Sequence, residues 1–110
     1  MAVHPDLGAG RWQTLTLAEQ LGNIGSEVGR AIRAKANQDD RRLEGALTQA
    51  LDVFDLSLAN ARWQGSKVRE IARAREITCD YLAGDNAYGS TAESLDAYFT
   101  QFAVLARHGK

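Results

Sequence analysis

The sequence has few residues that interrupt helices or cross-link a chain. Its 110 residues include one proline and one cysteine, and its longest uninterrupted hydrophobic run is Phe102–Ala106. A lone cysteine cannot form an internal disulfide, which suits a reducing cytosol. So short a run cannot span a bilayer, and residues 1–10 lack the basic and apolar regions of a signal peptide. We therefore expect a cytoplasmic protein with no membrane partner.

The sequence also lacks a large excess of either acidic or basic residues, and it lacks the residue clusters that are typical of catalytic sites. Thirteen basic and fourteen acidic residues give a net charge of −1, so no overall field attracts nucleic acid or membrane. His4 and His108 lie near the two ends, which excludes the Glu-x-x-His pairs of a di-iron bundle. Cys79 has no histidine placed to activate it. We expect no catalytic residue, metal or cofactor, and hence no enzyme.

In place of those features the chain has four stretches with apolar residues spaced three and four apart, the pattern of amphipathic helices. The first begins at a capping box of Thr16 and Glu19 and extends to about Ala36. The polar residues 37–40 end it, and the second stretch extends to near Asn60. Long helices joined by short connections are typical of an all-α fold.

Two further helices follow with their own start and stop signals. Ser66 is placed to cap the third helix and Gly84 to end it in the left-handed conformation. A second capping box, Ser90 with Glu93, begins the fourth. The pattern predicts an antiparallel up-down four-helix bundle over residues 16–107, a flexible N-terminal arm over residues 1–15 and a C-terminal tail over residues 108–110.

The loop over residues 84–90 carries turn-forming residues. Asp85 and Asn86 are types whose side chains bond to nearby backbone groups. We expect them to turn the chain, and we expect Tyr88 to pack against the end of the bundle. The sequence therefore predicts an ordered loop.

The predicted helices carry more apolar and small-residue surface than a small bundle buries. The apolar arc of the third helix is much wider than the roughly 100° that bundle packing needs. Each glycine inside the first helix costs about 1 kcal/mol in helix propensity. Either the close approach of another helix offsets this cost, or the first helix is loose. These surplus faces predict a homo-oligomer. The candidate interface residues are Gly22, Gly25, Gly29, Val53, Leu56, Ile77 and Tyr81.

Some charged residues also attract attention. Arg75 projects into the apolar side of the third helix. This predicts a buried charge with a carboxylate or carbonyl partner, a long side chain whose guanidinium reaches the end of the bundle, or else a ligand-binding arginine. Acidic residues lie within one helical turn of most basic ones, so strong binding of nucleic acid is disfavoured. A basic patch would form only if the assembly of several chains brought basic residues together and apart from the acidic ones. Its candidate residues are Arg30, Arg33, Lys35, Arg62 and Lys67.

Two stretches together resemble a known family. They are RWQTLTLAEQLGNIGSEVGRAI over residues 11–32 and REIARAREITCDYLAGDNAYGSTAESLDAYFTQFA over residues 69–103. They resemble the bacterial four-helix-bundle proteins encoded in intervening sequences of large-subunit ribosomal RNA genes. That family is similar to the accessory variability determinant of diversity-generating retroelements. The resemblance covers about residues 11–107 and implies a four-helix bundle that assembles as a pentameric barrel.

Two functions follow from these observations. The first is a non-enzymatic oligomeric scaffold that assembles alone or binds a protein partner. The second is an accessory protein associated with nucleic acid or a reverse transcriptase, which the resemblance to the retroelement members implies. Those members are basic, whereas this chain has a pI of about 6.1. The charge balance therefore favours the scaffold.

Overall fold

The structure is a computed structural model that describes residues 9–108. His4 and parts of the predicted arm and tail lie outside the described residues. The described chain is helical, without a strand, and confirms the predicted all-α class. Its helices are α1 (Ala9–Trp12), α2 (Leu17–Ala36), α3 (Asp40–Leu58), α4 (Ser66–Ala83) and α5 (Ala92–His108).

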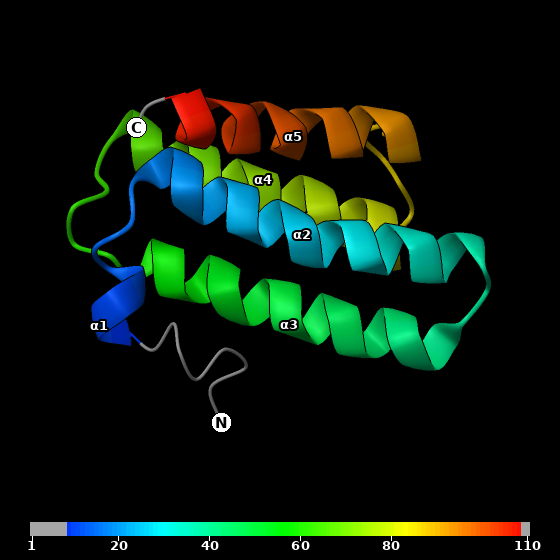
Figure 1. Cartoon of the computed structure of the whole chain (residues 1–110). Coiled ribbons are helices and arrows are strands. Elements are labelled where there is room, and N and C mark those ends of the chain that lie inside the picture. Colours follow the sequence, from blue (N-terminus) through cyan, green and yellow to red (C-terminus); the bar gives the residue numbers. More distant parts are fainter. Residues whose placement is uncertain (1–8, 109–110) are drawn as a thin grey trace.

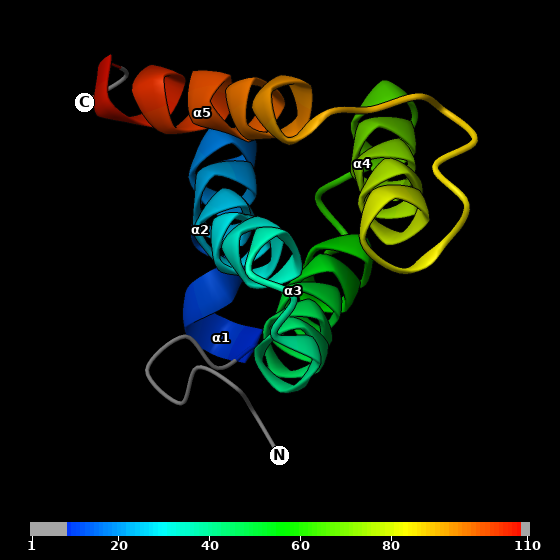
Figure 2. The ribbon, with the colours of Figure 1, turned by 90° about the vertical axis from the view of Figure 1, so that its right-hand side faces the viewer.

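Helix α2 occupies the centre of the molecule, because it packs against α3, α4 and α5 (Figure 1). Figure 2 looks nearly along α2, α3 and α4, whereas α5 appears lengthwise and crosses over α2. Helix α5 rests mainly on α2 and has only sparse contact with α4. The four helices are therefore not packed evenly around one axis, and the up-down four-helix bundle stays a prediction.

The start of α2 follows the sequence prediction. The backbone N–H of Glu19 donates to Oγ1 of Thr16 over 3.1 Å, and the backbone N–H of Thr16 donates to Oε1 of Glu19 over 2.9 Å. This capping box satisfies donors that a helix start leaves unpaired. Helix α2 ends at Ala36, and Asp39 caps α3 by accepting from the N–H of Arg42 over 3.1 Å.

Three other helix ends differ from the predictions. Gly65, in the left-handed region with φ +61°, precedes α4 and leaves Ser66 as its first residue. Gly84 follows α4 with φ −105° and is not left-handed. The box at the start of α5 lies one residue later than the predicted box of Ser90 and Glu93. The backbone N–H of Thr91 donates to Oγ of Ser94, and the backbone N–H of Ser94 donates to Oγ1 of Thr91, each over 2.9 Å.

The core lies where α2, α3, α4 and α5 meet around α2. The edge of Phe54 on α3 meets Phe99 on α5, with ring centroids 6.2 Å apart. Contact of this type adds about 0.5–1.5 kcal/mol beyond area burial. The buried apolar cluster is Trp12, Leu21, Ile24, Val28, Ala50, Val53, Phe54, Trp63, Ile71, Ala74, Leu95 and Phe99.

A buried hydrogen-bond network joins α1, α2, α3 and the turn before α4. Nε1 of Trp12 donates to Oγ of Ser57 over 3.0 Å, and that hydroxyl donates to Oε1 of Gln20 over 2.8 Å. Nε1 of Trp63 donates to the same Oε1 over 2.9 Å. Nε2 of Gln20 donates to the carbonyl of Trp12 over 2.9 Å. The network gives the buried indole N–H groups and the Gln20 amide their partners, as buried polar groups require.

This network corrects the prediction of a flexible arm. Trp12 is fully buried and belongs to the core cluster. Residues 9–12 form a helix, and the N–H of Leu15 donates to the carbonyl of Trp12 over 3.1 Å. Residues 9–15 are therefore part of the folded unit.

Candidate interaction surfaces

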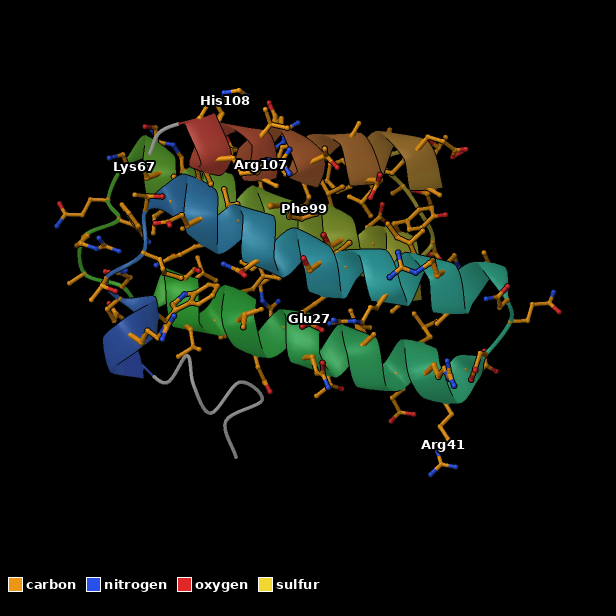
Figure 3. The ribbon with its side chains drawn as sticks, in the orientation of Figure 1. Glu27, Arg41, Lys67, Phe99, Arg107 and His108 are labelled. Carbon is orange, nitrogen blue, oxygen red and sulfur yellow. The ribbon has the colours of Figure 1, made fainter. Side chains whose placement is uncertain are left out.

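The contact between α2 and α5 rests on glycines of α2. A Cβ added to Gly25 would lie 2.6 Å from Cβ of Phe99, and one added to Gly22 would lie 3.1 Å from Cα of Ala103. Figure 3 labels Phe99 on α5, above α2. Because a longer side chain would separate the helices, these glycines mark the predicted close approach. The approaching helix is α5 of the same chain.

Two other residues predicted at the oligomer interface also have partners inside the chain. Gly29 is buried, and a Cβ added to it would lie 3.5 Å from Nη1 of Arg33, so that guanidinium covers it. Val53 is 2% exposed and belongs to the core, so its prediction as a surface residue was wrong. The reason is that α3 packs against both α2 and α4, and the two contacts bury a wide face.

The remaining predicted interface residues are half-buried. The ammonium of Lys35 lies 5.5 Å from the centre of the Tyr81 ring, which joins the C-terminal ends of α2 and α4. Leu56 and Ile77 pack against the core and keep part of their surface exposed. An oligomer interface at these residues stays a prediction.

Helix α5 is rich in apolar residues yet contributes only Leu95 and Phe99 to the buried core. The run Phe102–Ala106, the longest in the chain, contains no buried residue, and Leu105 is 56% exposed. Five successive apolar residues encircle a helix at about 100° per residue, so packing on α2 covers only one side. Figure 2 shows this half of α5 extending beyond α2. Its outer side is uncovered apolar surface that the sequence analysis did not single out.

The predicted basic patch is divided between the two ends of α2. The Arg62 guanidinium lies 4.4 Å and the Lys67 ammonium 5.5 Å from the centre of the Trp63 ring, which bonds to Gln20. Because an α-helix rises 1.5 Å per residue, Arg33 lies about 20 Å further along α2 than Gln20. Figure 3 labels Lys67 at the end where α2 begins. The five residues therefore do not form one patch in the single chain.

Three arginines line a groove between α2 and α3. It has a volume of about 510 Å³ and contains Arg30, Arg33 and Arg42. Nη1 of Arg30 pairs with Oε1 of Glu27 over 2.8 Å, and Nε of Arg42 pairs with Oδ2 of Asp39 over 3.4 Å. Arg33 has no ion pair among the described residues. Carboxylates thus offset most of the positive charge of the groove.

Arg75 has the carboxylate partner that the sequence predicted, but it is not a buried charge. Its Nε donates to Oδ1 of Asp55 on α3 over 3.1 Å. The Arg75 side chain is 35% exposed and that of Asp55 is 59% exposed. The apolar side of α4 was expected to bury Arg75, but the residue lies at its edge, where the guanidinium reaches solvent. An exposed pair of this kind contributes about 0–1 kcal/mol to stability.

The loop between α4 and α5 is held by side-chain bonds, as predicted, although Asp80 replaces Asp85 as a principal acceptor. Its carboxylate accepts from the backbone N–H of Ala87 over 2.8 Å and of Tyr88 over 3.1 Å. Asn86 exchanges two 2.9 Å bonds with the backbone of Ser90. The Tyr88 side chain lies on the outside of α4 and is 51% exposed.

The tyrosines of this region bond to carboxylates of α4. The Tyr88 hydroxyl donates to Oε1 of Glu76 over 2.7 Å, which raises the pKa of Tyr88 above its usual value. Tyr98 on α5 donates to Glu70, and burial together with this bond raises the pKa of Tyr98. Both hydroxyls therefore stay protonated as hydrogen-bond donors at neutral pH, and Tyr98 ties α5 to α4.

Cys79 lies half-buried on α4. Burial raises the pKa of its thiol. A raised pKa disfavours the thiolate, which is the nucleophilic form. The half-buried side chain therefore packs as a small apolar residue.

Within residues 9–108, no group of histidine, cysteine and carboxylate side chains is arranged to hold a metal ion. None of the helices described in that range is long and apolar enough to cross a membrane. No protein-family model matches the chain, and no curated protein or solved structure matches it. The geometry itself is therefore the basis for a function.

Proposed function

We propose that this chain is a non-enzymatic cytoplasmic protein that assembles with copies of itself and serves as a scaffold for a protein partner. One observation carries the proposal: the apolar run Phe102–Ala106 contains no buried residue. A helix that is apolar on all sides is normally buried on all sides. A second chain that covers this part of α5 would remove that surface from water.

The resemblance to the intervening-sequence proteins supports the same proposal and adds a subunit number. It implies a closed ring of five copies. Leu56 and Ile77, half-buried at the surface of α3 and α4, remain the proposed ring contacts. The helical arrangement leaves their outer surface accessible to a neighbouring copy.

Replacing Leu105 with glutamate is expected to break the contact made through α5. Light scattering coupled to size exclusion should give several times 12.0 kDa for the unmodified chain and a smaller mass for Leu105→Glu. The reason is that a carboxylate without a partner in a dry apolar contact carries a large desolvation cost. Because Leu105 is 56% exposed in the single chain, the fold should be unaffected.

Thr48→Glu is the matched control. Thr48 is exposed on α3, which makes few contacts with α5, and the change introduces the same negative charge. Its assembly should equal that of the unmodified chain. An unmodified chain that remains a monomer at micromolar concentration contradicts the proposed self-assembly.

The groove between α2 and α3 favours a second candidate function, that of a nucleic-acid-associated accessory protein. Three arginines line it, and Arg33 has no ion pair among the residues that the structure describes. Phosphate binding strengthens with the number of cationic side chains brought to the backbone. The carboxylates of Glu27 and Asp39 oppose it here. The scaffold is therefore our first proposal.

A gel-shift titration separates the two functions. At about 150 mM salt, near physiological ionic strength, we expect no complex below the roughly 1–100 µM range of non-specific binding. Nanomolar binding that weakens steeply with salt, and that Arg30→Ala with Arg33→Ala abolishes, contradicts this expectation. That result would make the accessory protein the better function.

A further inference from the structure

Charge is unevenly distributed along the chain, although the net charge is close to zero. Residues 76–106 contain five acidic residues and no lysine, arginine or histidine. They form the C-terminal half of α4, the loop over residues 84–90 and most of α5. Residues 30–42 contain five basic residues and two acidic ones, and they form the end of α2 and the start of α3. One region of the chain is therefore acidic and another is basic.

The basic region contains the groove of about 510 Å³ between α2 and α3, which Arg30, Arg33 and Arg42 line. The side chain of Arg30 is 59% exposed and that of Arg42 is 84% exposed, although each has an ion pair. Arg33 also lines a neighbouring groove with Glu93 and Asp96, but it has no ion pair among the described residues. All three guanidinium groups therefore keep donors that an anion from outside can reach.

The acidic region contains a loop that is exposed and yet fixed in shape. Hydrogen bonds to the Asp80 carboxylate and between Asn86 and Ser90 hold residues 84–90. Asp85 is exposed, and no hydrogen bond or ion pair within residues 9–108 engages its carboxylate. Tyr88 is one of the two large hydrophobic side chains exposed in the same range. Because the loop is already held in one conformation, it loses little conformational entropy when it binds.

The loop and the groove lie on different sides of the molecule. Figure 2 shows the loop on the far side of α4 from α2 and α3. On α2, at about 100° per residue, Arg30 and Asn37 lie nearly opposite the buried stripe of Leu21, Ile24 and Val28, so the groove opens away from the core. A contact between the loop of one chain and the groove of another is therefore heterologous. Contacts of this type build closed rings or filaments.

We propose that the loop over residues 84–90 of one copy binds in the groove between α2 and α3 of the next copy. The Asp85 carboxylate pairs with Arg33, and the exposed part of the Tyr88 ring packs against the guanidinium groups. Arginine forms strong pairs with carboxylates and also stacks on aromatic rings. The inference rests on the proposed self-assembly and adds a second contact to the one made through Phe102–Ala106.

The size and charge of the groove suit this loop. Its volume lies within the roughly 300–1,000 Å³ of clefts that hold small ligands, so there is room for a tyrosine ring and a carboxylate. Glu27 and Asp39 already pair with two of the three arginines, which leaves one positive charge. Asp85 supplies one negative charge. A nucleic-acid strand brings a phosphate at every nucleotide, which is more negative charge than the groove neutralises.

Charge reversal tests the contact. Arg33→Glu and, separately, Asp85→Arg should each weaken association about tenfold or more, because like charges then face each other. Both changes in one chain should restore the affinity, since the groove of each copy again faces a loop of opposite charge. Sedimentation equilibrium over a range of concentrations measures the association. Unchanged affinity in the single variants, or no recovery in the combined one, overturns the proposal.

Arg41→Glu and Asp52→Arg are the matched controls. They introduce the same changes of charge at exposed positions outside the loop and outside the residues that line the groove. Figure 3 shows Arg41 pointing away from α2. Both controls should associate as the unmodified chain does. If they weaken association as much as Arg33→Glu and Asp85→Arg, the total charge governs assembly and the loop contact is wrong.

The Leu105→Glu chain separates this contact from the one made through α5. Leu105→Glu alone should keep a mass above that of one chain, and the addition of Arg33→Glu should lower it to 12.0 kDa. If the unmodified chain associates but Arg33→Glu has no effect in either chain, the self-assembly stands and the loop contact is wrong. An oligonucleotide that binds the unmodified chain and not Arg33→Glu, while self-association is unchanged, also overturns the proposal.

Discussion

Replacing Trp12 with alanine is expected to lower the free energy of unfolding by about 3–5 kcal/mol. Trp12 is fully buried in the core beside α3, so the change leaves a cavity as large as an indole. It also removes the donor to the Ser57 hydroxyl. The measurement is urea unfolding followed by far-ultraviolet circular dichroism, which does not depend on the tryptophan that is removed.

Trp12→Phe is the intermediate variant. The phenyl ring keeps much of the buried apolar contact but loses the indole N–H and part of the ring volume, so the expected loss of stability is smaller than for alanine. A typical intramolecular hydrogen bond contributes about 0.5–1.5 kcal/mol. If Trp12→Ala changes the stability by less than about 0.5 kcal/mol, the range of ordinary surface substitutions, then residues 9–15 are not packed as described.

Replacing Gly25 with leucine is expected to destabilise the fold by about 3 kcal/mol, the upper end for overpacking. Even a methyl group would lie 2.6 Å from Cβ of Phe99, an atom fixed to the backbone of α5. Helix α5 must therefore move away from α2, and the ring of Phe99 loses burial. Thermal unfolding and hydrogen exchange along α5 measure the change.

Gly29→Ala is the matched control on the same helix. The added Cβ would meet only the Arg33 guanidinium at 3.5 Å, an ordinary contact with a flexible side chain. Alanine has a helix propensity about 1 kcal/mol better than glycine, so this variant should be more stable than the unmodified chain. Opposite signs for the two variants are the expected result. Stabilisation by both would mean that Gly25 does not face α5.

The sequence predicted the features of this fold that depend on neighbouring residues. The spacing of apolar residues located the four long helices, and Thr16 with Glu19 located the start of α2 correctly. The interior glycines correctly indicated a close helix contact. They did not identify the helix, because a missing side chain says only that some backbone comes near.

The features that were missed depend on contacts between distant residues. Helix α1 has four residues, too few for a periodic pattern, and Trp12 is ordered by Ser57 and Gln20. The oblique course of α5 follows from the fit of Phe99 over Gly25, which no local pattern encodes. The start of α5 was placed one residue early because Ser90 and Thr91 are both good caps, and Thr91 makes the bonds.

The buried network also determines what the protein's own fluorescence can report. Both tryptophans of the chain, Trp12 and Trp63, belong to this one network around Gln20. Their emission therefore follows the polarity and packing around this one network. Far-ultraviolet circular dichroism counts the helical residues of α5 as well. Coincident unfolding transitions by fluorescence and by circular dichroism would indicate a single cooperative unit. A loss of the dichroism signal before the red shift of the tryptophan emission would indicate that α5 separates from α2 first.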